Sequence, residues 1–365
     1  MNQKKKEEIL NFIVKDFIKT AEPVASKTLV SKNKLNYSSS AIRTEMNKLE
    51  KEGFLEKIHN SSGRIPLKKA YEHYLNDIQI NNDNVIDKNF KKNLKEIIDK
   101  KILSVSNVIN DSCKILAEMT NLAVISSGRE NIKEYLEKIM LFPISNNSAT
   151  AFFLTNKGYS ESKTFIFSDG INPEDVSNFI EIFNKYLKGT LISEIISKME
   201  SMKSVLLTQG KSIIYKAIFE MFLNFTRKHY EFYGKDKLFK QPEFKNNIEK
   251  LKRILEIFND PKKIESEVSK ITTNKKIGGV DVYISDSKKN NVSVLSIPIY
   301  FEGEISSKIY LVGPPRMDYD KGINLLNYLK NTINEYFKNL GGCKKCLIEN
   351  QKKKKERKNC NNKKS

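Results

Sequence analysis

The sequence is poor in cysteine and histidine and contains no long apolar run. Four cysteines in 365 residues are too few for a disulfide framework, so a reducing intracellular compartment is expected. No apolar stretch approaches the ~20 residues that a transmembrane helix requires. We therefore predict a cytoplasmic protein with no membrane partner.

The three histidines, His59, His73 and His229, lie far apart in the sequence. None of them has the helical spacing to a carboxylate that is typical of a metal site. The chain also lacks a glycine-rich phosphate loop and a nucleophile motif. We therefore predict no catalytic residue, no metal and no cofactor, and the chain is not expected to be an enzyme.

Cys343 and Cys346 form a Cys-x-x-Cys pair, which supplies two of the four ligands that a structural zinc ion needs. Cys360 offers a third ligand, and a fourth is not evident. We interpret residues 342–365 as a disordered basic tail with incidental cysteines. Its lysine run, Lys352–Lys355, is expected to attract phosphate nonspecifically.

The chain carries a large positive charge. The formal net charge is +20 and the pI is about 9.5, which favours an acidic partner such as nucleic acid. Residues 1–80 contain 15 Lys+Arg against 10 Asp+Glu, and residues 343–365 contain 10 against 2. The tail is thus the most charge-dense part.

Residues 35–66 organise the rest of the chain. Ile42, Met46 and Leu49 recur at helical spacing, and a serine run and Gly53 bound the predicted helix at about 39–52. The opposite face collects polar and basic side chains: Ser40, Arg43, Thr44, Asn47, Lys48 and Lys51. Such side chains hydrogen-bond base edges in the major groove of DNA.

A small hairpin is predicted directly after this helix, with a turn at residues 60–63 and a return strand at 64–66. Arg64 beside Gly63 can extend from the turn toward a phosphate or a narrow minor groove. Two further helices are expected before residue 35, and Lys27 lies on the outer side of the second. The pattern is typical of a winged helix-turn-helix, although a solvated helix face and an ordinary turn would explain the same residues.

The remaining sequence predicts a mixed α+β architecture. Helical periodicity runs from Phe90 to Leu122, and short strand-like runs and a helix at about 173–187 follow. Residues 190–265 return to helical periodicity, and strands resume at Gly278. A helical block inside a strand-rich region indicates an insertion. Residues 313–319 predict a strand-to-helix turn with Asp318 as the helix cap, although Arg316 and Asp318 would also suit a ligand pocket.

Several short stretches carry a family resemblance, in the chain order Glu22-Pro23-Val24, Ser38-Ser39, Ile42-Arg43, Gly53-Phe54-Leu55, Gly63-Arg64, Met119-Thr120-Asn121-Leu122-Ala123, Pro242-Glu243-Phe244 and Gly313-Pro314 with Arg316-Met317-Asp318-Tyr319. Together they resemble the family of heat-inducible transcription repressors called HrcA. The resemblance covers roughly residues 5–340. One departure is Glu72, which stands where family members usually have arginine, so it is not assigned to DNA.

The resemblance implies a domain organisation. It predicts a winged helix-turn-helix over residues 1–80 and a GAF-like α+β domain in two parts, 85–189 and 268–341. A helical dimerisation insert would interrupt this domain at 190–267, and the basic tail would follow at 342–365.

The resemblance also implies a function: a homodimeric repressor that binds a double-stranded inverted repeat called CIRCE upstream of chaperone genes and depends on the GroEL chaperonin. The residues expected to bind DNA are Lys27, Ser39, Ser40, Arg43, Thr44, Asn47, Lys48, His59, Ser61, Gly63 and Arg64. The residues expected to form the dimer are Phe219, Met221, Phe222 and Phe225. The alternative functions are a GAF-type sensor of a small ligand and a general basic nucleic-acid-binding protein.

Overall fold

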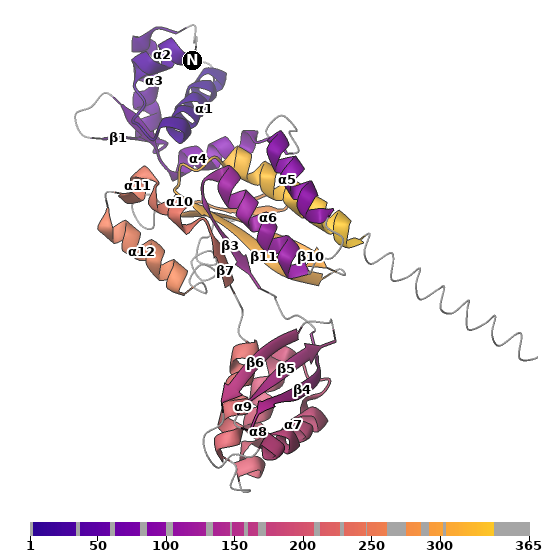
Figure 1. The fold of residues 1–365 in the computed structure, drawn as a ribbon. Coiled ribbons are helices and arrows are strands. Elements are labelled where there is room, and N and C mark those ends of the chain that lie inside the picture. The colour runs from indigo at the N-terminus through magenta and orange to yellow at the C-terminus, as the bar shows by residue number, and fades with distance from the viewer. Residues whose placement is uncertain are drawn as a thin grey trace, which may run out of the picture. The chain divides into compact units, whose positions relative to one another are not determined.

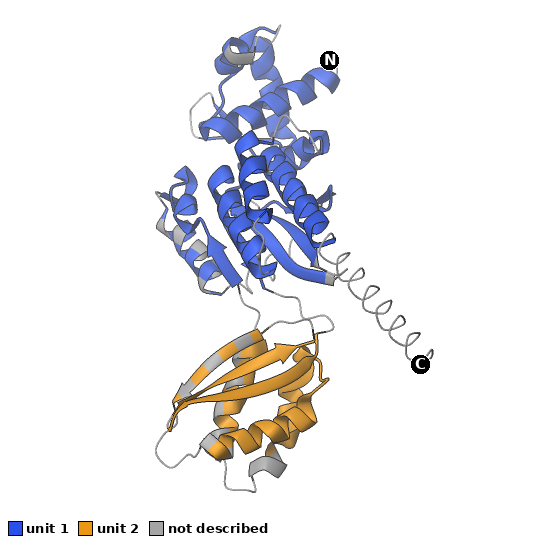
Figure 2. Cartoon of the chain, turned by 45° about the vertical axis from the view of Figure 1, so that its right-hand side comes forward, with its two compact units in different colours: residues 1–128, 230–365 blue, residues 129–229 orange. Residues whose placement is uncertain are grey.

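The structure is a computed structural model, and it divides the chain into two compact units (Figure 2). Unit 1 comprises residues 1–128 and 230–365, and unit 2 comprises residues 129–229. The described residues are 3–33, 37–58, 63–80, 86–99, 105–128, 134–146, 148–156, 160–166, 173–207, 212–226, 230–245, 247–260, 275–285, 292–301 and 304–338. The predicted tail, with its three cysteines, lies outside them.

Unit 1 begins with a group of helices and a two-stranded hairpin (Figure 1). The elements are α1 (Gln3–Thr20), α2 (Ser26–Asn33), α3 (Ser39–Lys51), β1 (Leu55–Lys57), β2 (Arg64–Pro66), α4 (Lys68–Tyr74) and the 3-10 turn η1 (Leu75–Asp77). The hairpin is antiparallel, with Leu55 opposite Pro66. The core between these helices and the hairpin includes Ile13 of α1 and Leu49 of α3, both fully buried. Burial of these apolar stripes holds the helices together.

The rest of unit 1 is built on a six-stranded antiparallel sheet in the order β7-β3-β11-β10-β9-β8. The strands are β3 (Ala123–Ser127), β7 (Tyr230–Tyr233), β8 (Lys275–Ile277), β9 (Val280–Tyr283), β10 (Ser293–Phe301) and β11 (Glu304–Gly313). The outer strand β7 follows unit 2 in the sequence and still pairs with β3, which precedes unit 2. Unit 2 is therefore inserted between two neighbouring strands.

Helices cover both faces of this sheet, because its residues alternate between two apolar clusters. Val124 packs with α5 (Lys88–Ile98), α6 (Val105–Thr120) and the helical residues 319–338. Its neighbour Ile125 packs on the other face, with the second set of helices. These are α10 (Lys235–Phe239), α11 (Pro242–Lys245) and α12 (Ile248–Asn259).

Unit 2 packs a three-stranded antiparallel sheet, in the order β4-β5-β6, against helices. Its elements are β4 (Leu136–Ser145), β5 (Ser148–Thr155), β6 (Ser160–Ile166), α7 (Pro173–Leu187), η2 (Ile192–Glu194), α8 (Ile195–Leu207) and α9 (Ser212–Thr226). Alternate residues of β5, such as Ala151 and Phe153, are buried, and the residues between them are only half-buried. One face of the sheet therefore forms the core.

The observed unit 2 differs from the predicted insert of 190–267. The predicted first part of the GAF-like domain, 85–189, contains β4 to β6 and α7, but these elements share a core with α8 and α9. The predicted insert contains residues 230–260, but these residues supply β7 and the helices α10 to α12 of unit 1. Periodicity identifies a strand locally and does not say which sheet it joins.

The predicted dimerisation residues also require correction. Phe222 and Phe225 are 0% and 5% exposed, and their rings pack on Phe153, with centroids 5.0 and 4.9 Å away. They are core residues of their own unit and have no surface to offer a second copy. Phe219 is half-buried beside Tyr215, and the side chain of Met221 lies outside the described residues.

Within the described ranges, no helix combines the length and apolar character needed to cross a membrane.

Candidate nucleic-acid interface

Helix α3 has one buried apolar face and one exposed polar face. Ile42, Met46 and Leu49 are between 0% and 2% exposed. The exposed residues of the helix lie opposite them: Ser40, Arg43, Thr44, Asn47, Lys48 and Lys51. This confirms the two faces that the sequence predicts.

The two ends of α3 are fixed by local hydrogen bonds. The amide of Ala41 donates to the Ser38 hydroxyl at 3.2 Å, so Ser38 is the N-cap. At the other end the amide of Gly53 donates to the Glu50 carbonyl at 3.0 Å, and that of Phe54 to the Leu49 carbonyl at 2.9 Å. Gly53 has φ +78°, the left-handed conformation that this stop requires. The predicted helix boundaries are confirmed.

Helix α2 is tied to the start of α3. The hydroxyl oxygens of Ser26 and Ser39 lie 3.0 Å apart in a half-buried hydrogen bond. Ser39 therefore faces α2, which limits its reach toward an outside partner. Lys27, the next residue of α2 after Ser26, is exposed. Of the predicted residues in these two helices, Lys27 and the five on the exposed face of α3 are free to meet a large ligand.

The hairpin is joined to the segment before α2. Val24 and Arg64 exchange two backbone hydrogen bonds, each of 2.9 Å. A Cβ atom at Gly63 would lie 2.7 Å from the Cβ of Pro23, so only glycine fits this approach. His59 and Ser61, which the sequence also assigns to DNA, lie outside the described residues.

Arg64 does not extend outward from the hairpin. Its side chain is 7% exposed; its Nε lies 2.6 Å from Oε2 of Glu50, and its Nη2 donates to Oδ1 of Asn47 at 2.8 Å. Both partners belong to α3, one turn apart, on the side facing the hairpin. The structure thus gives Arg64 a different place from the predicted one: it locks the hairpin to the helix. The i, i+3 spacing of Asn47 and Glu50 puts both side chains on the same side of α3. The sequence alone does not predict that Arg64 points toward that side.

We expect the Arg64→Ala substitution to lower the free energy of local opening of the hairpin and α3 by about 2 kcal/mol, because it removes a charge-assisted hydrogen bond from a largely buried site. Amide hydrogen exchange of β2 and α3 measures this local opening. The matched control is Arg43→Ala, which removes an exposed arginine of α3 that makes no such contact with the described residues of the hairpin. Equal protection in the two variants would contradict the locking role.

The chain is similar to known proteins over most of its length. The family model described as "HrcA protein C terminal domain" matches residues 106–323, which is more than half of the chain. The chain belongs to the HrcA family. The match to the HrcA model runs from α6 to the helix at 319–338 and so spans unit 2 and both parts of the sheet.

Curated relatives and one solved structure extend this match to most of the chain. A heat-inducible transcription repressor HrcA of Halalkalibacterium halodurans is 29% identical over 91% of this chain and 96% of its own length. The HrcA of Bacillus pumilus is 29% identical, with coverage of 91% and 97%. A crystal structure of a hypothetical protein has the same fold, with a TM-score of 0.64 at 22% identity and coverage of 92% and 98%.

Proposed function

We propose that this HrcA-family chain is a dimeric, sequence-specific DNA-binding repressor of heat-shock chaperone genes. In this proposal α3 is the recognition helix and the β1–β2 hairpin is the wing of a winged helix-turn-helix. The observation that carries the proposal is the exposed face of α3, where six hydrogen-bonding or basic side chains stand opposite three buried apolar ones. The name of the two HrcA relatives, heat-inducible transcription repressor, supports it.

The exposed side chains of α3 suit the major groove. Arg43 has the fork of donors that pairs with guanine O6 and N7. Oδ1 of Asn47 accepts a hydrogen bond from Nη2 of Arg64, so the Asn47 side-chain NH2 group remains to donate to a base or phosphate acceptor. Lys27 and Lys48 are exposed lysines that would contact phosphates, which fix register without reading sequence. Arg64, in strand β2 of the wing, contacts Asn47 and Glu50 of α3 and so holds the wing against the helix.

An inverted repeat demands a two-fold axis in the protein, so the proposed repressor is a dimer. We assign the dimer interface to unit 2. The sheet face of unit 2 that turns away from its helices carries large exposed apolar side chains. Phe142 is 51% exposed, Ile144 62% and Ile166 87%, and the ring of Phe142 contacts that of Phe152 edge-on. Exposed apolar residues gathered on one sheet face mark an interaction surface. We therefore assign the dimer interface to this surface and not to the buried phenylalanines of α9.

Two further parts of the proposal concern unit 1. We assign the six-stranded sheet and its helices to a GAF-like domain, since an antiparallel sheet with helices on both faces fits that architecture. We also propose that the chain reaches its DNA-binding state with the help of the GroEL chaperonin. Strands β3 and β7 pair although the whole of unit 2 separates them in the sequence. Such non-local contacts form slowly during folding, and apolar surface stays exposed until they have formed.

The chaperonin requirement is tested by diluting denatured protein into buffer. Operator binding is expected to recover with GroEL and ATP, and to stay low with GroEL alone. Full recovery in buffer without chaperonin would contradict this part of the proposal.

The repressor proposal itself is tested by titrating a labelled inverted-repeat duplex at raised salt with excess competitor DNA. Specific binding is expected to be at least about 10³-fold tighter than binding to a scrambled duplex of equal length. Equal affinities would favour the general nucleic-acid-binding alternative. Absence of DNA binding at any salt concentration would favour the ligand sensor.

A further inference from the structure

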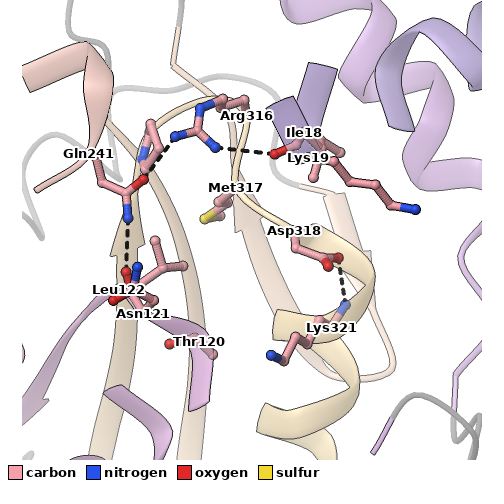
Figure 3. A pocket seen from close by; sticks show the side chains of 11 residues that line it. Ile18, Lys19, Thr120, Asn121, Leu122, Gln241, Arg316, Met317, Asp318 and Lys321 are labelled. Atoms are coloured by element: carbon pink, nitrogen blue, oxygen red, sulfur yellow. Dashed lines mark hydrogen bonds between the residues drawn. The ribbon is translucent and has the colours of Figure 1, made fainter. Parts of the chain in front are cut away.

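Arg316 lies where three distant stretches of unit 1 meet, beside a cavity of about 210 Å³ (Figure 3). Its guanidinium group binds the Glu243 carboxylate through Nε and Nη2, and Nη2 also donates to Oε1 of Gln241 at 2.9 Å. Gln241 in turn donates to the Asn121 carbonyl at 2.9 Å. The three stretches around residues 121, 243 and 316 are those that carry the family resemblance outside the N-terminal helices. They form one polar cluster.

The third partner of Arg316 belongs to the helical N-terminal part. Nη1 of Arg316 donates to the Ile18 carbonyl at 3.2 Å, across 298 positions of sequence. Ile18 lies in the last turn of α1, whose carbonyls have no amide partner within the helix. A positive charge at a helix C-terminus is also favourable. The contact therefore gives α1 a fixed end on the sheet-containing part of unit 1.

A second attachment involves α4, which follows the hairpin in the sequence. The rings of Tyr71 in α4 and Tyr319 are both buried, with centroids 5.9 Å apart. Burial raises the pKa of both hydroxyls above the ordinary value. Nearby, Nδ2 of Asn324 donates to the Gln79 carbonyl at 3.2 Å. This attachment is mainly apolar.

Two separate attachments fix the orientation of the N-terminal helices relative to the sheet-containing part of unit 1 more firmly than one attachment does. At residues 71–79 the helical part is held by Tyr71, by Asn76, which bonds to Lys275, and by Gln79. The tie at α1 adds a second attachment, at a different helix. Helix α1 shares its core with α3, where Ile9 and Ile13 pack in one apolar cluster with Ile42. The direction of α3 therefore follows the position of α1.

We infer that Arg316 is a positioning residue for DNA recognition: it fixes the direction in which each subunit presents α3. This inference rests on the proposed function. In a dimer, the direction of the two recognition helices sets the half-site spacing that both can engage at once. Simultaneous engagement multiplies affinity only where the geometry permits it. Without Arg316 each helix still reads its half-site, but the pair loses its preference for one spacing.

The test compares three duplexes: a single half-site, the inverted repeat, and inverted repeats with the spacer changed by one to three base pairs. Two variants remove the tie. Arg316→Ala deletes the guanidinium group, and the double variant Arg316→Met with Glu243→Gln removes both charges together, so that no carboxylate is left unpaired. The control is Lys19→Ala, which removes an exposed cation from the rim of the same cavity.

For both tie-removing variants we expect half-site affinity equal to wild type, inverted-repeat affinity about tenfold weaker, and a flattened dependence on spacer length. The Lys19→Ala control should keep the wild-type spacing preference. An unchanged spacing preference would overturn the inference, and so would an equal loss on half-site and inverted repeat, or failure of both variants to fold, because each indicates a merely structural role. If wild type itself does not prefer the inverted repeat, the proposed function fails instead.

Discussion

Replacing Arg43 by alanine is expected to weaken binding to the inverted repeat by about 1–3 kcal/mol per half-site, the usual worth of a bidentate arginine–guanine contact. Arg43 is exposed, and it lies on the opposite face of α3 from Ile42, Met46 and Leu49. The folded state should therefore not lose stability. Titration at fixed salt, together with thermal unfolding, measures both quantities.

The matched control for Arg43 is Lys51→Ala, which removes a positive charge from the exposed side of the same helix. A lysine that only attracts phosphate contributes equally on every sequence. Lys51→Ala should thus lower affinity for the inverted repeat and the scrambled duplex by the same factor, whereas Arg43→Ala should reduce the ratio between them. A ratio unchanged by Arg43→Ala would remove this residue from the reading of bases.

Placing a glutamate at Ile144 is expected to convert the dimer to a monomer and to lower affinity for the inverted repeat by about 10² or more. The charge would lie at an exposed apolar position of β4, two residues after Phe142, where burial against a second copy leaves it unpaired. Two linked half-sites gain affinity from joint engagement, and a monomer loses that gain. Sedimentation and operator titration measure the two effects.

Two further variants keep this prediction falsifiable. Tyr186→Glu introduces the same charge at an exposed aromatic residue of α7 and should leave the dimer intact. Phe222→Ala should destabilise unit 2 by about 3–5 kcal/mol, because it empties a packed core position. A persistent dimer in Ile144→Glu would show that the subunits meet elsewhere.

Features fixed by neighbouring residues were predictable from the sequence. The ends of α3 depend on Ser38 and Gly53, and its two faces depend on the spacing of Ile42, Met46 and Leu49. Helix α7 likewise matches the predicted 173–187. Each of these signals acts within one or two helical turns, so no knowledge of tertiary contacts was needed.

Features that depend on distant partners were not predictable. Strands β4 to β6 have the pattern of any half-buried sheet, and only their packing with α8 and α9 places them in unit 2. The phenylalanines of α9 form an apolar stripe that suits a subunit interface as well as an internal core. Arg64 carries the same charge whether it points outward or toward Glu50. Arg316 meets Ile18 across almost the whole chain.

The most direct test of α3 as a reader of the major groove is methylation protection of the inverted repeat by the full chain. Dimethyl sulfate methylates guanine at N7, which lies in the major groove, and adenine at N3, which lies in the minor groove. Bound wild type is expected to protect guanine N7 at symmetric positions in both half-sites, and Arg43→Ala to lose that protection first. Protection confined to adenine N3, or none at saturating protein, would contradict the account.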